Sequence, residues 1–323
     1  MRRRILLQAG GAIAAAATAV AARAQAWPSR PIRLVVPFPA GGGTDAMARA
    51  LGEAIAQDTG QPVFVDNRAG AGTVIGNDLV AKSAPDGHTL LLNTSALAIV
   101  PSLYPRLPYP ADTAFAAVML LGRAPNVAVV RAESPLASAA DFLAKARARP
   151  GGLAYGSAGN GTSTHLAAEL LKNSAGIFVT HVPYRGATPM VNDVLAGQID
   201  LGFGTLPSVA PFLATGKLRA LAVTAGRRSP LLPAVPTFAE AGVAGYEADV
   251  WYGLFAPAGL PDALLQAVHA AMRRASATPA FERRAAQEGL QLTREDPAAT
   301  ERIVREERAK WLRLVQAQSI KAE

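Results

Sequence analysis

The stretch of the sequence best suited to chemistry is a glycine-rich segment, residues 37–45. It follows an apolar run, residues 32–36, which is typical of a buried strand, and it opens a helical pattern over residues 44–58. A turn of this kind leaves several backbone N–H groups unpaired at the positive end of a helix. It therefore predicts an anion site, and by itself it admits phosphate, pyrophosphate or carboxylate.

A second segment, residues 155–164, repeats this plan of strand, small-residue loop and helix. It adds hydroxyl groups that can donate to a carboxylate, on Ser157, Thr162, Ser163 and Thr164. Two opposed loops rich in backbone amides suit a small anion, with a carboxylate at each end as one possibility. The alternative is that both segments are tight turns followed by capped helices.

Other polar residues follow predicted strands. Arg185 could hold a carboxylate bidentately or pair with an acid. Asp45 could complement the dipole of its helix or accept a ligand amine. The predicted ligand-binding residues come from both loops and from the ends of neighbouring strands: Phe38, Ala40, Gly41, Gly43, Thr44, Asp45, Ser95, Ser157, Gly159, Thr162, Ser163, Arg185, Gly186 and Thr205.

A dinucleotide site competes with this interpretation. Gly41-x-Gly43-x-x-Ala46 matches the spacing of the nicotinamide and flavin fingerprint, and Asp66 follows the next strand. Pro37 and Pro39 interrupt the strand before the glycines, whereas the fingerprint needs the strand to run into them. An exported Rossmann-type oxidoreductase that uses NAD or FAD stays the alternative. The chain lacks Gly-Lys-Ser/Thr, so a nucleotide P-loop is excluded.

The first 26 residues predict an export signal. Three arginines precede an apolar, alanine-rich segment, and Ala-x-Ala sites place cleavage near Ala24 or Ala26. Either ordinary secretion or twin-arginine export fits, and a membrane anchor is the alternative. The chain has no cysteine, so a lipid anchor and disulfides are excluded. We expect a periplasmic protein whose formal charge falls from +8 to about +4 on cleavage.

Strand-like runs alternate with helical patterns along the rest of the chain, which predicts two α/β lobes with mainly parallel sheets. We expect residues 27–123 and 252–323 in one lobe and 124–251 in the other, with a hinged cleft between them. Helices over 263–277 and 298–318 are expected to finish the chain. The basic residues are spread along helices, so nucleic-acid binding is not expected.

Together these segments resemble the TctC-type (Bug) extracytoplasmic solute-binding proteins. The resemblance covers nearly all of the mature chain, in the motifs VVPFPAGGGTD (35–45), NRAGAG (67–72), YGSAGNGT (155–162), VPYRG (182–186), LRALAVT (218–224) and VPTFAEAG (235–242). It implies a type II periplasmic binding-protein fold that closes on a small carboxylate, amino acid or aromatic acid. It also implies a monomer without enzymatic activity, cofactor or metal. Its partner would be a tripartite tricarboxylate transporter or a membrane sensor.

Three residues depart from the family pattern. Leu97 and Val100 replace polar residues, and Gly204 stands where many relatives carry an acid. These changes predict a smaller, more apolar pocket floor, which favours a monocarboxylate or an aromatic acid over a citrate-like ligand.

Overall fold

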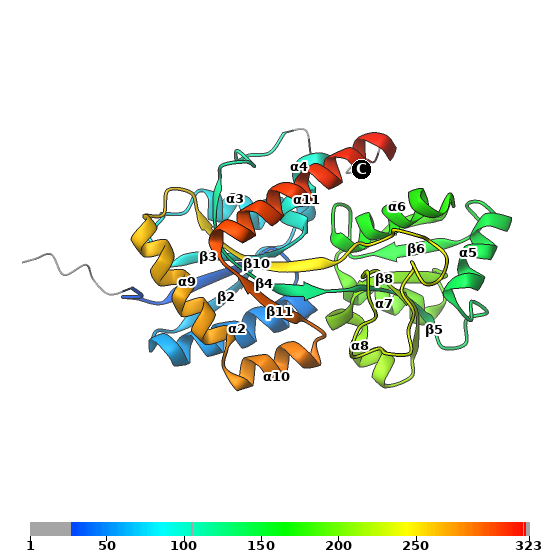
Figure 1. The fold of residues 1–323 in the computed structure, drawn as a ribbon, viewed down its shortest axis with the longest axis horizontal. Coiled ribbons are helices and arrows are strands. Elements are labelled where there is room, and N and C mark those ends of the chain that lie inside the picture. The colour runs from blue at the N-terminus through cyan, green and yellow to red at the C-terminus, as the bar shows by residue number, and fades with distance from the viewer. Residues whose placement is uncertain (1–26, 105, 319, 321–323) are drawn as a thin grey trace, which may run out of the picture.

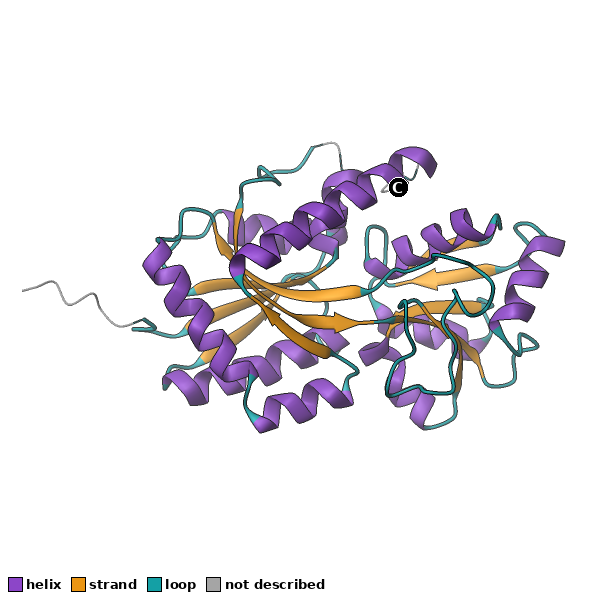
Figure 2. Ribbon diagram, viewed as in Figure 1, coloured by secondary structure: helices purple, strands orange, loops and turns teal. Residues whose placement is uncertain are grey.

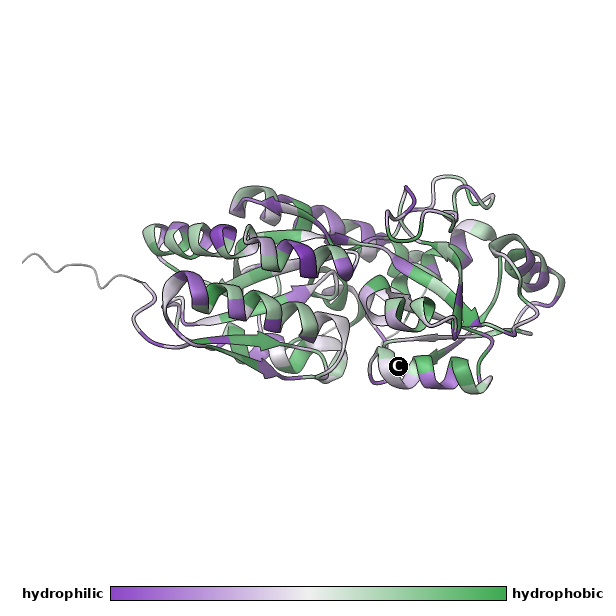
Figure 3. Cartoon of the chain, turned by 90° about the horizontal axis from the view of Figure 1, so that it is seen from below, coloured by the Kyte–Doolittle hydropathy of each residue, from purple (hydrophilic) through white to green (hydrophobic). Residues whose placement is uncertain are grey.

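The computed structural model describes residues 27–104, 106–318 and 320. Two sheets lie side by side, each with helices on both faces, and long strands run from one to the other (Figures 1 and 2). We call the bodies built on them the first and second lobes. The helices alternate hydrophilic and hydrophobic stretches along their length (Figure 3), as expected for helices that cover a sheet.

The first lobe contains a six-stranded sheet in the order β11-β4-β10-β3-β1-β2. Its strands are β1 (Ile32–Val36), β2 (Val63–Asn67), β3 (Thr89–Thr94), β4 (Phe115–Ala124), β10 (Val250–Pro257) and β11 (Gln291–Glu295). The helices on one face are α2 (Gly43–Thr59), α9 (Asp262–Ser276) and α10 (Pro279–Gln287), and those on the other are α3 (Val74–Ala81), α4 (Ala96–Leu103) and α11 (Pro297–Gln318). A short 3-10 turn, η1 (Ala71–Thr73), precedes α3.

The second lobe contains a five-stranded sheet in the order β7-β6-β8-β5-β9. Its strands are β5 (Asn126–Arg131), β6 (Ala154–Ser157), β7 (Thr180–Pro183), β8 (Leu201–Thr205) and β9 (Leu218–Val223). Helices α5 (Ala139–Ala148) and α6 (Ser163–Ala175) cover one face, and α7 (Ala187–Ala196) and α8 (Leu206–Ala214) cover the other.

Two connections between the lobes are hydrogen-bonded to each other. Strand β4 passes into β5 across Pro125, and the chain returns to β10 after β9. The Thr224 N–H donates to the Asn126 carbonyl at 2.9 Å, and the Ala248 N–H donates to the Thr224 carbonyl at 2.9 Å. The Asn126 side chain also donates to the Ala248 carbonyl at 3.2 Å. The two connections therefore cross between the lobes as one narrow, hydrogen-bonded strip.

Helix α11 adds a contact between the lobes that the sequence did not predict. It packs along α4 and β4 in the first lobe, and its last turn reaches α6 of the second (Figure 1). There the Gln318 amide donates to Asn173 Oδ1 at 2.7 Å.

The prediction of mainly parallel sheets was wrong. Strand β1 pairs in parallel with β2 and β3, and β6 pairs in parallel with β7 and β8. Every pairing of β4, β5, β9, β10 or β11 with another strand is antiparallel. Parallel neighbours need a crossover helix, and the strands that connect the lobes return without one.

Most predicted elements of the two lobes are present with small shifts of their ends, but three were missed. Helix α4 is almost entirely buried and contains Pro101, so it shows neither amphipathic spacing nor a normal helical composition. Helix α10 begins with Pro279 after Thr278, whose hydroxyl accepts from the Phe281 N–H. Edge strand β11 pairs irregularly with β4, which explains its weak pattern.

Candidate functional site

Two adjoining cavities lie between the lobes. The large cavity has a volume of about 650 Å³ and the small cavity about 220 Å³. The residues that line both are Phe38, Pro39, Ala158, Thr162, Arg185 and Gly186. The shared wall therefore contains parts of both glycine loops, which we call the first glycine loop (37–45) and the second glycine loop (155–164).

The first turns of four helices surround the small cavity. Its wall contains the residues at which α2, α6, α7 and α8 begin: Gly42 and Gly43, Thr162 and Ser163, Gly186 and Ala187, and Thr205. Backbone N–H groups in the first turn of a helix have no acceptor within that helix, and the helix dipole is positive there. Among the described residues, Arg185 is the only one with a charged side chain that lines either cavity. The small cavity is thus electropositive and suited to an anion.

The first glycine loop is organised by a buried carboxylate. Asp45 Oδ2 accepts from the Gly41 N–H and from Arg49 Nε, both at 2.9 Å, and Oδ1 accepts from the Asn67 amide at 3.1 Å. Burial alone would raise the pKa of Asp45, but the hydrogen bonds from Arg49, Gly41 and Asn67 outweigh it and lower the pKa. The carboxylate therefore stays ionised and fixes the loop.

The second glycine loop is organised by neutral side chains. Ser157 Oγ lies 2.7 Å from His181 Nε2 and accepts from the Gly159 N–H at 3.2 Å. The Gly161 N–H donates to His165 Nδ1 at 3.2 Å. The His165 and His181 rings stack with their centroids 4.2 Å apart. Burial lowers the pKa of His165 to about 4 and that of His181 to about 3, so both rings are neutral at physiological pH.

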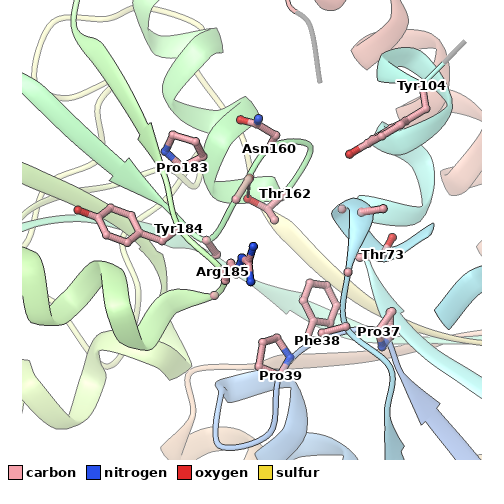
Figure 4. Close-up of a pocket in the computed structure, with 17 residues that line it drawn as sticks. Pro37, Phe38, Pro39, Thr73, Tyr104, Asn160, Thr162, Pro183, Tyr184 and Arg185 are labelled. Atoms are coloured by element: carbon pink, nitrogen blue, oxygen red, sulfur yellow. Dashed lines mark hydrogen bonds between the residues drawn. The ribbon is translucent and has the colours of Figure 1, made fainter. Parts of the chain in front are cut away.

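The large cavity extends away from the helix starts. Figure 4 shows Arg185 pointing into it, with Tyr104 and Thr73 on the opposite wall. Asn160 and Pro183 border it on the side of the second lobe. This cavity offers aromatic and uncharged polar surface next to the electropositive small cavity.

The structure brings together most of the predicted site residues. Those that line one or both cavities are Phe38, Ala40, Gly43, Thr44, Gly159, Thr162, Ser163, Arg185, Gly186 and Thr205. Gly41, Asp45, Ser95 and Ser157 do not line either cavity. Asp45 and Ser157 organise the loops, while the Ser95 hydroxyl accepts from the Trp251 N–H at 3.0 Å.

The predicted apolar pocket floor was wrong. Leu97, Val100 and Gly204 line neither cavity. Leu97 and Val100 are buried in α4. A Cβ added to Gly204 would lie 2.5 Å from Val209 Cγ1, so this position faces the packing of α8 and not the ligand space.

Several wall residues were missed because they carry no local signal. Thr73 and Tyr104 lie far from both glycine loops in sequence, and Ser208 belongs to the first turn of α8. The Gly70–Gly72 segment, quoted in the motif at 67–72, lines the large cavity as well.

The residues and the connection on which the dinucleotide alternative depends have other roles in the structure. Asp66 accepts hydrogen bonds from Arg33 and Arg68, so its carboxylate is held within the first lobe. Six residues separate the end of β1 from the start of α2, in place of a direct entry into the glycines.

Two features are absent from the described residues. No group of three or more His, Cys, Asp or Glu side chains could hold a metal ion. No helix is both long and apolar enough to cross a membrane. The predicted export signal, residues 1–26, lies outside the described residues.

Comparison with known proteins gives one consistent family. Residues 47–320 match the model of the tripartite tricarboxylate transporter family receptor, TctC. The chain is 37% identical to Protein BugT of Bordetella pertussis over 314 residues, which cover 97% of this chain and 96% of BugT.

Solved structures agree with this family. Rpa4515 of R. palustris, solved with adipate, is 34% identical with a TM-score of 0.87, over 91% of this chain and 99% of that one. MatC from Rhodopseudomonas palustris, solved with bound malate, is 32% identical with a TM-score of 0.83, over 90% of this chain and 100% of that one.

Proposed function

Because this chain belongs to the TctC family of tripartite tricarboxylate transporter receptors, we propose that it captures a small carboxylate between its two lobes and delivers it to such a transporter. The ligand is a monocarboxylate, a dicarboxylate, an amino acid or an aromatic acid. Its binding residues are the predicted residues of the two glycine loops together with Ser95, Arg185, Gly186 and Thr205. Some of these contact the ligand, and the others hold the contacting residues in place.

The observation that carries this proposal is the convergence of four helix starts on one small cavity beside Arg185. A carboxylate there would accept from unpaired backbone N–H groups and from the guanidinium. No acidic side chain among the described residues of the wall opposes it. The adipate and malate held by two relatives are both carboxylates, which supports the same choice of anion.

The pair of cavities also suggests how the ligand lies. One carboxylate occupies the small cavity, and the remainder of the molecule extends into the large cavity past Arg185. The wall there, with Tyr104 and Thr73, accepts either an aliphatic or an aromatic body.

Binding closes the lobes about the strip at Asn126, Thr224 and Ala248. The moving bodies are residues 27–123 with 252–323, and residues 124–251. The transporter recognises the closed form of a monomeric receptor in the periplasm, reached after removal of the signal segment near Ala24 or Ala26.

Isothermal titration of the mature protein with a panel of carboxylates tests this function. We expect at least one panel member to bind. Arg185→Ala should weaken it by roughly 30- to 100-fold through loss of a charge-assisted hydrogen bond, and Arg185→Lys should retain part of the affinity. Arg68→Ala, which removes an arginine outside the cavities, is the control. A wild-type protein that binds no carboxylate, or an Arg185→Ala variant with unchanged affinity, would contradict the proposal.

A further inference from the structure

A buried tyrosine that makes no well-formed hydrogen bond lies behind the small cavity. Tyr252, on β10, has an exposed fraction of 0%. Its hydroxyl is buried and makes no hydrogen bond of acceptable geometry within the described part of the chain. An unsatisfied buried hydroxyl is destabilising, so its presence needs an explanation.

The surroundings of this hydroxyl supply one. It faces the side chains of Thr44 and Thr205, both of which line the small cavity. Thr44 belongs to the first turn of α2 in the first lobe, and Thr205 ends β8 in the second. On the neighbouring strand β3, Thr94 pairs with Tyr252 and lines the same cavity. Tyr252 thus stands where the two lobes meet beneath the helix starts.

The phenol remains neutral at this position. Burial raises the pKa of Tyr252 to about 12, although the side chains of Thr205 and Thr44 act in the opposite direction. A neutral phenol can donate one hydrogen bond and accept another. The Thr205 hydroxyl lies 2.7 Å from Ser208 Oγ. If Tyr252 accepts from Thr44 and donates to Thr205, and Ser208 also donates to Thr205, the Thr205 proton stays free to donate to an anion in the cavity.

We propose that Tyr252 is a positioning residue of the anion site, which accepts from Thr44 and orients the hydroxyl of Thr205 toward the bound anion. This inference rests on the proposed function. The three hydroxyls form one floor with a contribution from each lobe, so the floor is complete only when the lobes are together. Tyr252 thereby couples affinity to closure without touching the ligand.

A second buried tyrosine provides a matched control. Tyr246 has an exposed fraction of 2%, and its hydroxyl donates to the Ala167 carbonyl at 2.8 Å. It lines neither cavity. Removing the Tyr246 hydroxyl breaks a well-formed hydrogen bond to a residue that lines neither cavity, whereas the Tyr252 hydroxyl makes no well-formed hydrogen bond within the described protein.

The experiment compares Tyr252→Phe with Tyr246→Phe. The probe is the carboxylate, from a panel that includes adipate and malate, that the wild-type protein binds most tightly by isothermal titration. Tyr252→Phe should lower affinity about tenfold, the effect of one hydrogen bond to an anion site. It should not lower the midpoint of urea unfolding of the ligand-free protein, because the hydroxyl that it removes makes no well-formed hydrogen bond there. Tyr246→Phe should lower that midpoint and leave affinity unchanged.

A double variant tests whether Tyr252 acts through threonine. Combining Tyr252→Phe with Thr205→Val should weaken binding little more than Thr205→Val alone, because the two act as a unit. The inference would be overturned if Tyr252→Phe bound as tightly as the wild type. It would also be overturned if Tyr252→Phe lowered the unfolding midpoint as far as Tyr246→Phe does, or if the two losses of affinity were fully additive in the double variant. If the wild type binds no carboxylate, the proposed function fails and the inference fails with it; if the wild type binds and Tyr252→Phe binds equally, only the inference fails.

Discussion

The two glycine loops share one architecture and are held by opposite chemistry. Each follows a strand, and each opens a helix whose first turn faces the small cavity. The first is fixed by an ionised carboxylate, Asp45, and the second by neutral groups that include Ser157, His165 and His181. The shared anion site therefore depends on two networks that respond differently to pH and to mutation.

This difference shows which parts of the site can vary. Both loops present backbone N–H and hydroxyl groups to the cavity. The Asp45 carboxylate, in contrast, is hydrogen-bonded to Arg49 and Asn67 within its own lobe. The hydrogen-bond network that holds a loop can therefore be ionic or neutral, provided that the first turn of the helix still points at the cavity.

The largest expected effect that separates the loops is the pH dependence of stability. The folded-state pKa values of His165 and His181, about 4 and about 3, lie below the ordinary value of 6.5. Below pH 6.5 the unfolded state therefore binds more protons, and stability falls as pH falls toward the folded values. Each histidine contributes about 1.4 kcal/mol per pH unit in this window. Asp249, whose pKa burial raises to about 6, acts in the opposite direction below pH 6.

Urea unfolding between pH 7 and pH 4.5 measures this effect, with an expected net loss of about 3 kcal/mol. In His181→Asn the profile should be flatter by about 1.4 kcal/mol per unit, because one histidine no longer titrates. Parallel profiles for the variant and the wild type would show that the second loop is not held by a neutral His181.

The next effect concerns the carboxylate under the first loop. Asp45→Ala should cost about 2 kcal/mol in urea unfolding, because the Gly41 N–H and the Asn67 amide lose their acceptor. It should also weaken carboxylate binding, since the loop is released. Asp66→Ala is the control: it removes another arginine-bonded acid of the first lobe that lines neither cavity. If the Asp45→Ala and Asp66→Ala variants bound the carboxylate with equal affinity, this would argue against a role of Asp45 in the loop.

A smaller effect is expected where the first loop meets the second lobe. A Cβ added to Gly43 would lie 2.6 Å from Pro207 Cβ in α8. Alanine is a good helix former, so Gly43→Ala should leave the first lobe intact and hold the lobes apart. We expect affinity to fall about tenfold and small-angle scattering of the ligand-saturated protein to show a larger radius of gyration. Gly42→Ala, whose Cβ would meet only Pro39 O at 3.7 Å, should retain the compact form; equal radii for the two variants would contradict this account.

The smallest effect belongs to one hydroxyl of the second loop. Ser157→Ala removes a partner from His181 and from the Gly159 N–H. We expect a loss of about 1 kcal/mol in urea unfolding, about half that of Asp45→Ala, because the broken hydrogen bonds are neutral. A loss as large as that of Asp45→Ala would remove the distinction between the two supports.

Local patterns in the sequence were sufficient to predict the loops and most of their elements. The apolar run at 32–36 and the glycines after it predicted β1 and the start of α2, because strand burial and helix starts depend on nearby residues. The repeat of this plan at 155–164 predicted the second half of the anion site.

Features that depend on the meeting of distant segments were not predictable. Tyr104, Thr73 and Tyr252 reach the cavities or their floor only through the packing of the lobes. The antiparallel pairings of β4 and β10 follow from the path of the chain between lobes. Gly204 was misplaced because a sequence does not reveal which face of a strand a residue occupies when both faces are covered.

The most direct test of the central claim is a crystal structure of the mature protein with its tightest-binding carboxylate. We predict that the carboxylate oxygens lie within about 3 Å of backbone N–H groups in the first turns of α2 and α6 and of the Arg185 guanidinium. A carboxylate bound only in the large cavity, beside Tyr104 and away from these helix starts, would contradict the account.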